Sequence, residues 1–510
     1  MTGVVFSMKS YYDYMNEISA DELYDGLLGY GLFSEKLPPI FSAVSFLTYC
    51  KKNPGFKKEP AEHITYNSMR NLNIPRTMGI PNPMQYEILC ATLKNNWPNL
   101  QQHFQKYTMT QPYRISRIHI RKAYDKANNA YQPKLFQMNY SNWRSDGTPE
   151  NDLLFHDGIA KKYVVHADIS TCFPSIYTHS LPWALVGKEA SKADKSNGKW
   201  YNKIDKACQN TTYGETHGLL IGPHASNLLA EIILVVVDHQ LYNDGYRFVR
   251  HIDDYDCYVE SYEQAQLFMN KLEHELRQFD LPLNYKKTRI EELPIASTKH
   301  WKRQLSTVLL VAPYGKTSYT EVNNYLDAAI KLAEEEKDSA ILNYAIKVLS
   351  GLDGITENGK SAAGKRILHL SILYPYLLPL LEEFVFVPFA TEKDEIKAFT
   401  NALFVDSFRI NNFEGIVYSI YYSLKYGFEI SGIDCAKLID TGDCLCLLMS
   451  WLYFRIWDKA KQNKLEQEAK RIAQIAMNRN WLFCYEALDS ANLPRGDWQT
   501  MKNAGVSFLK

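Results

Sequence analysis

The feature that most constrains the fold is a pair of adjacent aspartates, Asp253 and Asp254, between the apolar stretches YRFVRHI and YDCYV. Each stretch alternates apolar and polar side chains, so the sequence predicts two strands joined by a turn that carries both aspartates. By itself, such a turn would be a solvated loop. A third carboxylate, Asp168, ends a further apolar stretch, YVVHADI. If these strands share one sheet, the three carboxylates can hold a pair of divalent ions for in-line phosphoryl transfer, which is the chemistry of nucleic-acid polymerases.

Helical patterns alternate with these strands in an order that indicates an α+β fold. After the strand at 163–169, an apolar stripe predicts a helix from about Asn227, and the aspartate hairpin follows it. Ser261 and Gln264 form a capping box that opens a second helix, and a last strand covers 287–291. The predicted order is β-α-β-β-α-β, the split βαβ arrangement.

The chain is electrically neutral, with 57 basic and 57 acidic residues, so an enzyme that acts on nucleic acid would need segregated charge. Residues 106–144 meet this requirement, because their only acidic residue is Asp125. Cations for phosphates beside flat rings for bases favour a single-strand binding surface. A solvated basic helix with a few packing aromatics explains the segment equally well. The residues concerned are Lys106, Arg114, Arg117, Arg121, Lys122, Lys126, Lys134 and Arg144, with Tyr107, Tyr113, Tyr124, Tyr131, Phe136, Tyr140 and Trp143.

Nine cysteines are scattered without a C-x-x-C spacing, which argues against a zinc site and against a disulfide framework. We expect buried thiols in a reducing compartment. The N-terminus lacks a basic region followed by an apolar core, and no apolar run approaches the ~20 residues of a membrane span. These observations predict a cytoplasmic protein.

The 510 residues suggest three regions. Residues 1–60 show short helical patterns that end in a Lys/Pro-rich stretch, and residues 61–320 contain the predicted sheet. Helical patterns dominate residues 321–510, where we expect stacked helical pairs, although no fixed repeat period can be counted.

Several sequence blocks resemble, in order and spacing, the motifs of reverse transcriptases, over about residues 70–295. Further blocks are similar to those of the bacterial abortive-infection reverse transcriptases of the AbiK type. The general motifs are DISTCF from Asp168, GLLIGP from Gly218, the Asp253–Asp254 hairpin and LNYKKT from Leu283. The narrower ones are YTHSLPW from Tyr177, the pairs Gly187-Lys188 and Ser191-Lys192, and ETHG from Glu215.

The resemblance implies reverse-transcriptase-like fingers and palm followed by an all-α helical-repeat (HEAT-like) domain. It also implies a phage-defence DNA polymerase that takes deoxynucleoside triphosphates, uses Mg²⁺ or Mn²⁺ and forms a homo-oligomer in the bacterial cytoplasm. Relatives of this kind extend a protein hydroxyl without a template, so their DNA product is covalently attached. Other defence reverse transcriptases copy a partner non-coding RNA. An inactive palm that supports a partner-binding helical domain is a third interpretation.

The resemblance also implies roles for individual residues. Asp168, Asp253 and Asp254 would be the catalytic and metal-binding carboxylates, with Ile169 completing the metal-binding set. An inactive scaffold has no reason to keep three carboxylates at strand ends, because their repulsion costs stability unless a metal neutralises it.

Four residues would contact the incoming nucleotide. Phe173 would exclude the ribose 2′-hydroxyl as a steric gate, and Gly222 lies in the loop block that resembles a nucleotide-binding motif. Lys287 and Arg76 would bind the triphosphate, since a flexible ammonium suits phosphate as a point charge. A solvated surface charge is the alternative for both.

Protein priming requires a hydroxyl that can attack the first nucleotide. Tyrosine suits this role because its phenol, with a pKa near ~10, ionises more readily than Ser or Thr. The Tyr30-Gly31 pair resembles a Tyr-Gly pair in AbiK-like chains, so Tyr30 is the priming candidate. Tyr11, Tyr12 and Tyr14 compete with it, and all four could be packing residues.

Two positions depart from the family pattern. His251 stands ahead of the aspartate pair, at a position where the family usually has an aromatic residue. Its imidazole ring keeps the bulk and planarity of an aromatic side chain. Where the family often has a Gln that orients template and nucleotide, this chain has Ile221. Since Ile has no hydrogen-bonding side chain, it cannot brace a base edge. This departure agrees with untemplated synthesis.

Overall fold

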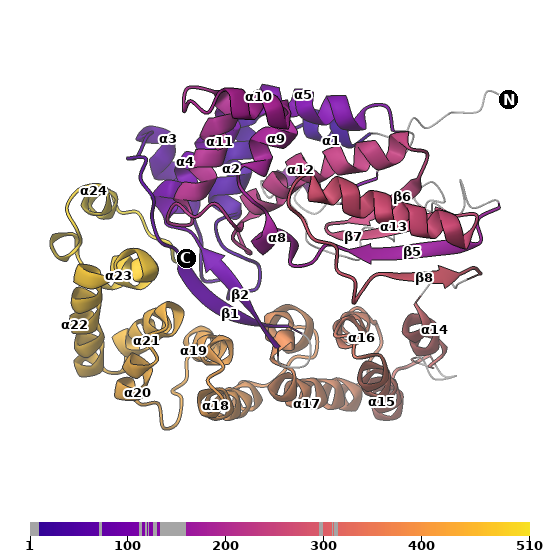
Figure 1. The fold of residues 1–510 in the computed structure, drawn as a ribbon. Helices are drawn as coiled ribbons and strands as arrows, with labels where there is room; N and C mark the ends of the chain where they lie inside the picture. Colours follow the sequence, from indigo (N-terminus) through magenta and orange to yellow (C-terminus); the bar gives the residue numbers. More distant parts are fainter. Residues whose placement is uncertain are drawn as a thin grey trace. The chain divides into compact units, whose positions relative to one another are not determined.

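The chain, seen in a computed structural model, divides into two compact units. The structure describes residues 10–70, 74–111, 115–117, 120, 122–125, 130–132, 160–294, 299–308, 310 and 315–510. The first unit comprises Met1–Ser34, Ser42–His63 and Gly79–Ile295. The second comprises Glu35–Phe41, Ile64–Met78 and Ala296–Lys510. In Figure 1 the first unit runs from indigo to salmon and the second is mainly brown to yellow.

A four-stranded antiparallel sheet lies at the centre of the first unit, in the order β6-β7-β5-β8. Val164 and Val165 point to opposite faces of β5 and are both fully buried, as expected of an inner strand that is covered on both faces. The predicted β-α-β-β-α-β order is confirmed. The strands are β5 (Tyr163–Asp168), β6 (Arg247–His251), β7 (Asp254–Val259) and β8 (Arg289–Glu292).

Two helices build the core behind this sheet, α12 (His224–Asn243) and α13 (Tyr262–Arg277). Helix α13 packs on β5 and β7, and α12 packs on α13 (Figure 1). The Ser261 hydroxyl accepts a hydrogen bond from the Gln264 backbone N–H, as the predicted cap requires. Helix α12 begins earlier than predicted, at His224, and is buried over most of its length.

The hairpin between β6 and β7 differs from the prediction in one respect. Only Ile252 and Asp253 form the turn, whereas Asp254 is the first residue of β7 and stands opposite Asp168 in the register. The prediction that both aspartates lie in the turn was therefore wrong. The turn closes in two residues because Ile252 adopts a left-handed conformation, with φ of 63°.

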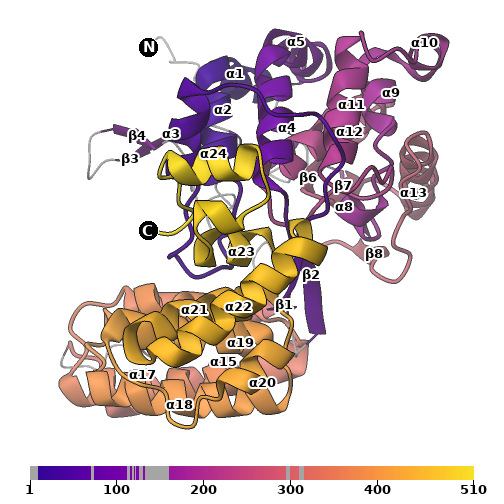
Figure 2. The same cartoon turned by 90° about the vertical axis from the view of Figure 1, so that its left-hand side faces the viewer.

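The remaining elements of the first unit surround this core. They are α1 (Tyr11–Asn16), α2 (Ala20–Tyr30), α3 (Val44–Lys52), α4 (Pro83–Asn95), α5 (Trp97–Thr108), the short strands β3 (Ala123–Asp125) and β4 (Ala130–Gln132), α8 (Cys172–Ser175), α9 (Ser180–Val186), α10 (Lys188–Ala193) and α11 (Trp200–Asn210). Helices α9, α10 and α11 lie side by side, as Figures 1 and 2 both show.

Where the structure describes it, the second unit is helical except for a hairpin of β1 (Ile64–Arg70) and β2 (Ile74–Ile80), and the last two residues of β2 belong to the first unit. Strand β1 packs on α19. The sequence pattern missed this hairpin because Pro75 interrupts β2; a two-stranded sheet tolerates proline since each strand has a free edge.

Residues 357–386 form a helical segment that changes type twice. Helix α17 is followed by a 3₁₀ turn containing Pro379 and then by a π-helical turn. The helices of this unit are α14 (His300–Thr307), α15 (Tyr319–Glu336), α16 (Ala340–Ser350), α17 (Glu357–Leu373), η2 (Pro375–Leu380), η3 (Glu382–Phe386), α18 (Lys393–Arg409), α19 (Phe413–Tyr426), α20 (Cys435–Asp440), α21 (Cys444–Trp457), α22 (Lys459–Ile475), η4 (Asn478–Asn480), α23 (Trp481–Ala487), η5 (Ser490–Asn492) and α24 (Asp497–Asn503).

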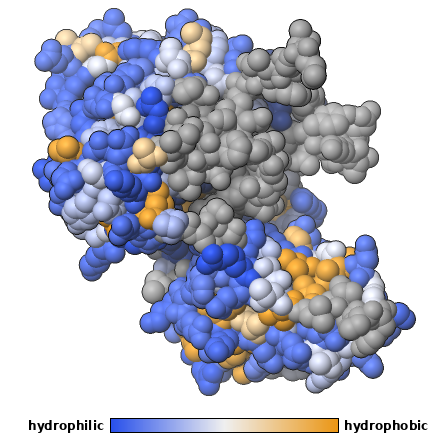
Figure 3. Space-filling model, turned by 90° about the vertical axis from the view of Figure 1, so that its right-hand side faces the viewer, coloured by the Kyte–Doolittle hydropathy of each residue, from blue (hydrophilic) through white to orange (hydrophobic). Residues whose placement is uncertain are grey.

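All nine cysteines are free and buried, as the sequence predicted. Within the described residues, no helix is both long enough and apolar enough to cross a bilayer. On the face shown in Figure 3, the described surface of the first unit is mainly hydrophilic, whereas hydrophobic residues gather over the second unit.

Candidate active site

The sheet brings the three predicted carboxylates together at one end. Asp168 is the last residue of β5 and Asp254 the first of β7, and these two residues are direct partners in the antiparallel register. The backbone N–H of Ile169 donates to the carbonyl of Asp253 at 3.1 Å, which fixes the turn against the end of β5. Side chains of such register partners lie on the same face of a sheet, so both carboxylates reach one side.

Asp168 is buried and its two carboxylate oxygens are both occupied. Asn284 donates from Nδ2 to Oδ1 at 2.7 Å, and Lys287 donates from Nζ to Oδ2 at 2.7 Å. The Asn284 backbone N–H also donates to the Asp168 carbonyl at 2.7 Å, so the segment after α13 is pinned to the end of β5. Lys287, predicted from its motif to bind triphosphate, thus lies beside the three carboxylates and brings a positive charge to them.

The carboxylates interact strongly. Partial burial of its carboxyl group, a hydrogen bond with Asp168 and the charge of Asp253 raise the pKa of Asp254 to about 7. The donors are hard oxygen atoms of the kind that Mg²⁺ and Mn²⁺ prefer, so their chemistry fits the predicted ions. Within the described parts of the chain, however, no three acidic, His or Cys side chains converge as a preformed metal site. Lys287 contacts one oxygen of Asp168, so an ion bound there would share that carboxylate with the ammonium or displace it.

A buried ionic network supports the hairpin, and the motif analysis did not find it. Arg250, with no exposed surface, forms ion pairs with Glu231 at 2.6 Å and with Asp238 at 2.7 Å, both from α12. The guanidinium also donates to the carbonyl of Ile252 at 2.8 Å. Ser116 completes the network by donating to Glu231 at 2.8 Å.

This network compensates for the conformation of the turn that carries Asp253. A β-branched residue at positive φ, such as Ile252, costs of order 1–3 kcal/mol and persists only where neighbours hold it in place. One local signal could have revealed the network. Glu231 and Asp238 are seven residues apart, two helical turns, so both carboxylates interrupt the same apolar face of α12.

Two of the four predicted nucleotide contacts, Phe173 and Gly222, lie on two segments that the first unit joins. Phe173 is buried on α8, and its carbonyl accepts from the Leu219 N–H at 2.8 Å. Gly222, with φ of 129°, follows on the same loop and needs the freedom of glycine. Ile221 accepts a backbone hydrogen bond from Gly79 at 2.9 Å. The fold thus brings Phe173 and the Gly218–Gly222 loop together.

Two further predicted residues, Arg76 and Tyr30, are distant in sequence from Phe173 and the Gly218–Gly222 loop. Arg76 is exposed on β2 in the second unit, and its role as a triphosphate contact stays a prediction. Tyr30 is the last residue of α2 and 39% exposed. Among its competitors, Tyr11 is buried, whereas Tyr12 and Tyr14 are half-buried.

Only a small part of the predicted basic and aromatic segment is described. Arg117 is buried and its backbone N–H donates to the Arg250 carbonyl at 2.8 Å, whereas Lys122 pairs with Glu22 at 2.6 Å. For Arg117, the prediction of a phosphate-binding surface residue was wrong, because the residue extends the edge of the sheet. Outside the described residues lie Arg114, Arg121, Lys126, Lys134, Arg144, Tyr113, Phe136, Tyr140 and Trp143.

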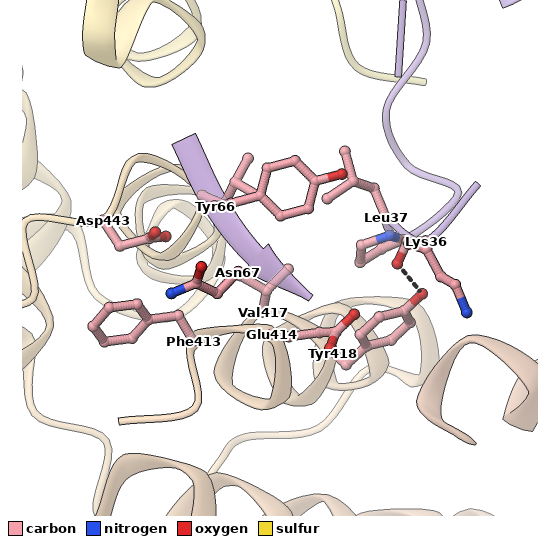
Figure 4. Close-up of a pocket in the computed structure, with 11 residues that line it drawn as sticks. Lys36, Leu37, Tyr66, Asn67, Phe413, Glu414, Val417, Tyr418 and Asp443 are labelled. Carbon is pink, nitrogen blue, oxygen red and sulfur yellow. Dashed lines mark hydrogen bonds between the residues drawn. The ribbon is translucent and has the colours of Figure 1, made fainter. Parts of the chain in front are cut away.

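The pocket drawn in Figure 4 is too small to be an alternative nucleotide site. This pocket in the second unit, lined by Lys36, Tyr66, Glu414 and Tyr418 among others, has a volume of about 10 Å³ (Figure 4). That space holds about one water molecule, not a nucleotide. The Glu414 carboxylate accepts from the Ser68 hydroxyl at 2.8 Å and from a backbone N–H, so it anchors the hairpin β1–β2 to α19.

Comparisons with known proteins agree with this geometry. Residues 95–310 match the family model described as reverse transcriptase (RNA-dependent DNA polymerase). No curated protein matches the chain. Among solved structures, the chain is similar to apo telomerase from Candida tropicalis, with 11% identity, 82% of this chain and 72% of that chain covered, and a TM-score of 0.32.

A second similar structure is telomerase from Candida albicans in complex with the TWJ fragment of telomeric RNA. The identity is 11%, the alignment covers 83% of this chain and 66% of that chain, and the TM-score is 0.29. These scores are low, so the assignment rests on the family model and on the carboxylate geometry. The chain carries a reverse transcriptase domain at residues 95–310 and is a nucleotidyltransferase of the RNA-directed DNA polymerase type.

Proposed function

We propose that this chain is a metal-dependent DNA polymerase that acts in anti-phage defence, starts synthesis on a protein hydroxyl and needs no template. The observation that carries the chemistry is that Asp168 and Asp254 are register partners at adjacent strand ends, with Asp253 in the turn next to them. The defence role and the mode of synthesis are supported by the sequence blocks that resemble AbiK-type enzymes. A bacterial, cytoplasmic homo-oligomer is part of the same proposal.

The carboxylates would hold Mg²⁺ or Mn²⁺, with the Ile169 backbone beside them. Divalent ions bound there would lower the charge on the triphosphate and activate the attacking hydroxyl. The chain's own residues prepare the site: Asn284 orients Asp168 by a hydrogen bond, and the ammonium of Lys287 offsets the clustered negative charge. When a nucleotide binds, Lys287 would exchange its contact with Asp168 for one with the triphosphate.

Replacing Lys287 with Gln is expected to raise the nucleotide KM about tenfold, because the triphosphate loses a cationic contact. A modest loss of thermal stability is also expected, since Lys287 is 55% exposed but its partner Asp168 is only 6% exposed and would lose the cation that offsets its charge. Steady-state kinetics with one labelled deoxynucleotide would measure the effect, with exposed Lys286→Gln as the matched control. A Lys287→Gln enzyme with unchanged KM and kcat would refute the contact.

Replacing Phe173 with Val is expected to raise the use of ribonucleotides relative to deoxynucleotides by roughly tenfold or more. The ring is 9% exposed on α8, five residues after Asp168, and a smaller side chain leaves room for the ribose 2′-hydroxyl. Competition between the two kinds of nucleotide gives the ratio directly. An unchanged ratio in a folded Phe173→Val enzyme would place the gate elsewhere.

Untemplated synthesis is supported by Ile221, which cannot hydrogen-bond to a base edge. Protein treated with RNase and DNase should therefore still incorporate nucleotides, whereas an enzyme that copies a partner RNA should lose activity after RNase. This treatment separates the proposal from its main alternative, an RNA-templated defence reverse transcriptase.

Tyr30 is the proposed priming residue, and Tyr30→Phe is expected to abolish covalent labelling of the protein by a radioactive nucleotide. Tyr30 is the most exposed residue of the four candidate tyrosines, and a nucleophile must be reachable. The product of the unaltered enzyme should resist boiling in detergent and be released from the phenol interface only by protease. Persistent labelling of the Tyr30→Phe enzyme would reject this residue, and protein-free product would reject protein priming.

A scaffold without catalysis is the remaining alternative. In that case the second unit, which the sequence resemblance describes as HEAT-like, would bind a partner protein and the palm would serve only as a support. The catalytic-aspartate variants discussed below distinguish the two, because a scaffold would retain its function in them.

A further inference from the structure

We propose that an exposed surface on the first unit, formed by Tyr177, Trp183, Lys188, Lys192 and His217, binds a single nucleic-acid strand beside the catalytic carboxylates. We name it the ring–lysine surface. The proposal rests on the polymerase function above and assigns a binding role to the blocks around Tyr177 and Glu215, which the catalytic cluster does not use.

The first observation is a pair of stacked rings. The Tyr177 and His217 ring centroids are 4.8 Å apart, with 28° between the planes. An antiparallel backbone bridge joins the two residues, and the N–H of Thr178 donates to the carbonyl of Thr216 at 2.8 Å. Because His217 is exposed, solvent reaches this stack and a base can add to it. Stacking on aromatic rings is how proteins bind single strands of any sequence.

The second observation is that the rings are held in place before any ligand arrives. His179 meets the Tyr177 ring edge-on, with centroids 4.8 Å apart, and its Nδ1 hydrogen-bonds to Asp205. Asp205 is buried and also accepts from Gln209 Nε2 at 2.7 Å. A preorganised stack loses less conformational entropy on binding than a mobile one.

The third observation is the positive charge beside the rings. Lys188 Nζ lies 4.1 Å from the centroid of the Trp183 ring, and Lys192 Nζ lies 6.0 Å from it. Trp183 in turn meets Tyr177 edge-on at 5.6 Å. These cation–π contacts keep two ammonium groups next to the stack, where they can bind phosphates.

The surrounding chain strengthens this charge. Residues 187–206 contain six lysines, all exposed, and three acidic residues. Of these acidic residues, Asp205 is buried against His179 and Asp194 pairs with Lys199 at 3.3 Å. The excess of exposed lysines complements a polyanion. A nucleic-acid strand therefore fits this surface better than a protein with few acidic residues.

The fourth observation is proximity to the reaction centre. Tyr177 follows Phe173 by four residues, so their Cα atoms are at most ~14 Å apart. The N–H groups of Gly218 and Leu219 donate to the carbonyls of Ile176 and Phe173 at 2.9 and 2.8 Å, so His217 is tied to the same segment. A strand that ends at the carboxylates can thus reach the ring–lysine surface within a few nucleotides.

The test is fluorescence anisotropy of labelled dT12 and rU12 with nuclease-treated, metal-free full-length protein over a range of salt concentrations. We expect His217→Ala to weaken binding about tenfold through lost stacking. Lys188→Gln with Lys192→Gln should lower the slope of log K against log salt by about 1.4, since each lysine releases ~0.7 counterions from a single strand. Tighter binding of rU12 assigns the surface to an RNA strand, and tighter binding of dT12 to a DNA strand.

Matched controls come from exposed residues of the second unit, His369→Ala and Lys397→Gln with Lys464→Gln, which should bind like the unaltered protein. Equal affinity and equal salt slope for the surface variants and the controls would overturn the proposal. Nucleotide incorporation with metal is measured in the same preparations. If the surface variants bind the strands and incorporate nucleotide as the unaltered protein does, only the proposed role of the ring–lysine surface is rejected. If the unaltered protein itself never incorporates nucleotide, the proposed polymerase function is rejected.

Discussion

Asp253→Asn and Asp168→Asn are each expected to reduce nucleotide incorporation by about 10³-fold or more, because each would remove a proposed ligand of the ions that stabilise transition-state charge. A loss of this size corresponds to about 4 kcal/mol of transition-state stabilisation. Asp168 is the last residue of β5, and Asp253 lies in the turn before β7, whose first residue, Asp254, is the register partner of Asp168.

The same variants should fold normally. The pKa of Asp254 is raised to about 7 partly by the charges of Asp253 and Asp168, so the carboxylates repel one another in the metal-free protein. Removing one charge is therefore expected to leave the melting temperature of metal-free Asp253→Asn unchanged or higher. Asp244→Asn is the matched control, since it removes a partly exposed carboxylate at the end of α12 and should retain activity. Near-normal incorporation by Asp253→Asn would contradict the assignment.

Arg250→Met is expected to destabilise the protein by about 3–5 kcal/mol, because it leaves Glu231 and Asp238 buried without their cationic partner. Thermal or urea unfolding measures this loss. Burial raises the pKa of Asp238 to about 6 even with Arg250 beside it, which shows how costly its negative charge is at this position. An Arg250→Met protein with unaltered stability would show that the network is not structural.

A second variant separates stability from the positioning of the hairpin. Replacing Arg250, Glu231 and Asp238 together with Met, Leu and Leu removes all three buried charges, so much of the stability should return. The hydrogen bond from Arg250 to the carbonyl of Ile252 is still absent, and the strained turn that carries Asp253 loses its support. We expect kcat to stay at least about tenfold below that of the unaltered enzyme, while KM changes little. Full recovery of kcat with stability would show that Arg250 does not position the turn.

The sequence predicted the palm well because its strands and helices are patterned locally. The apolar run that ends at Asp168, the stripe of α12 and the cap at Ser261 each predict an element without long-range information. The adjacency of Asp168 and the aspartate hairpin followed from the β-α-β-β-α-β order, which allows few topologies.

Other features depend on contacts that local patterns cannot contain. Asn284 and Lys287 lie 116 and 119 residues after Asp168, to which both donate hydrogen bonds. The motif therefore identified the two residues but not their contact with Asp168. Strand β2 was missed because Pro75 disfavours a strand, although the edge position removes the penalty. The position of Asp254 in β7 rather than in the turn depends on the left-handed Ile252, a conformation that isoleucine rarely adopts.

The most direct test of the central claim is incorporation of each labelled deoxynucleotide by nuclease-treated, purified protein with Mg²⁺ or Mn²⁺. Unaltered protein and Asp253→Asn are compared in parallel, with and without a metal chelator. We expect labelled polymer only from the unaltered protein and only with free divalent metal. Polymer of equal yield from Asp253→Asn, or from unaltered protein in excess chelator, would contradict it.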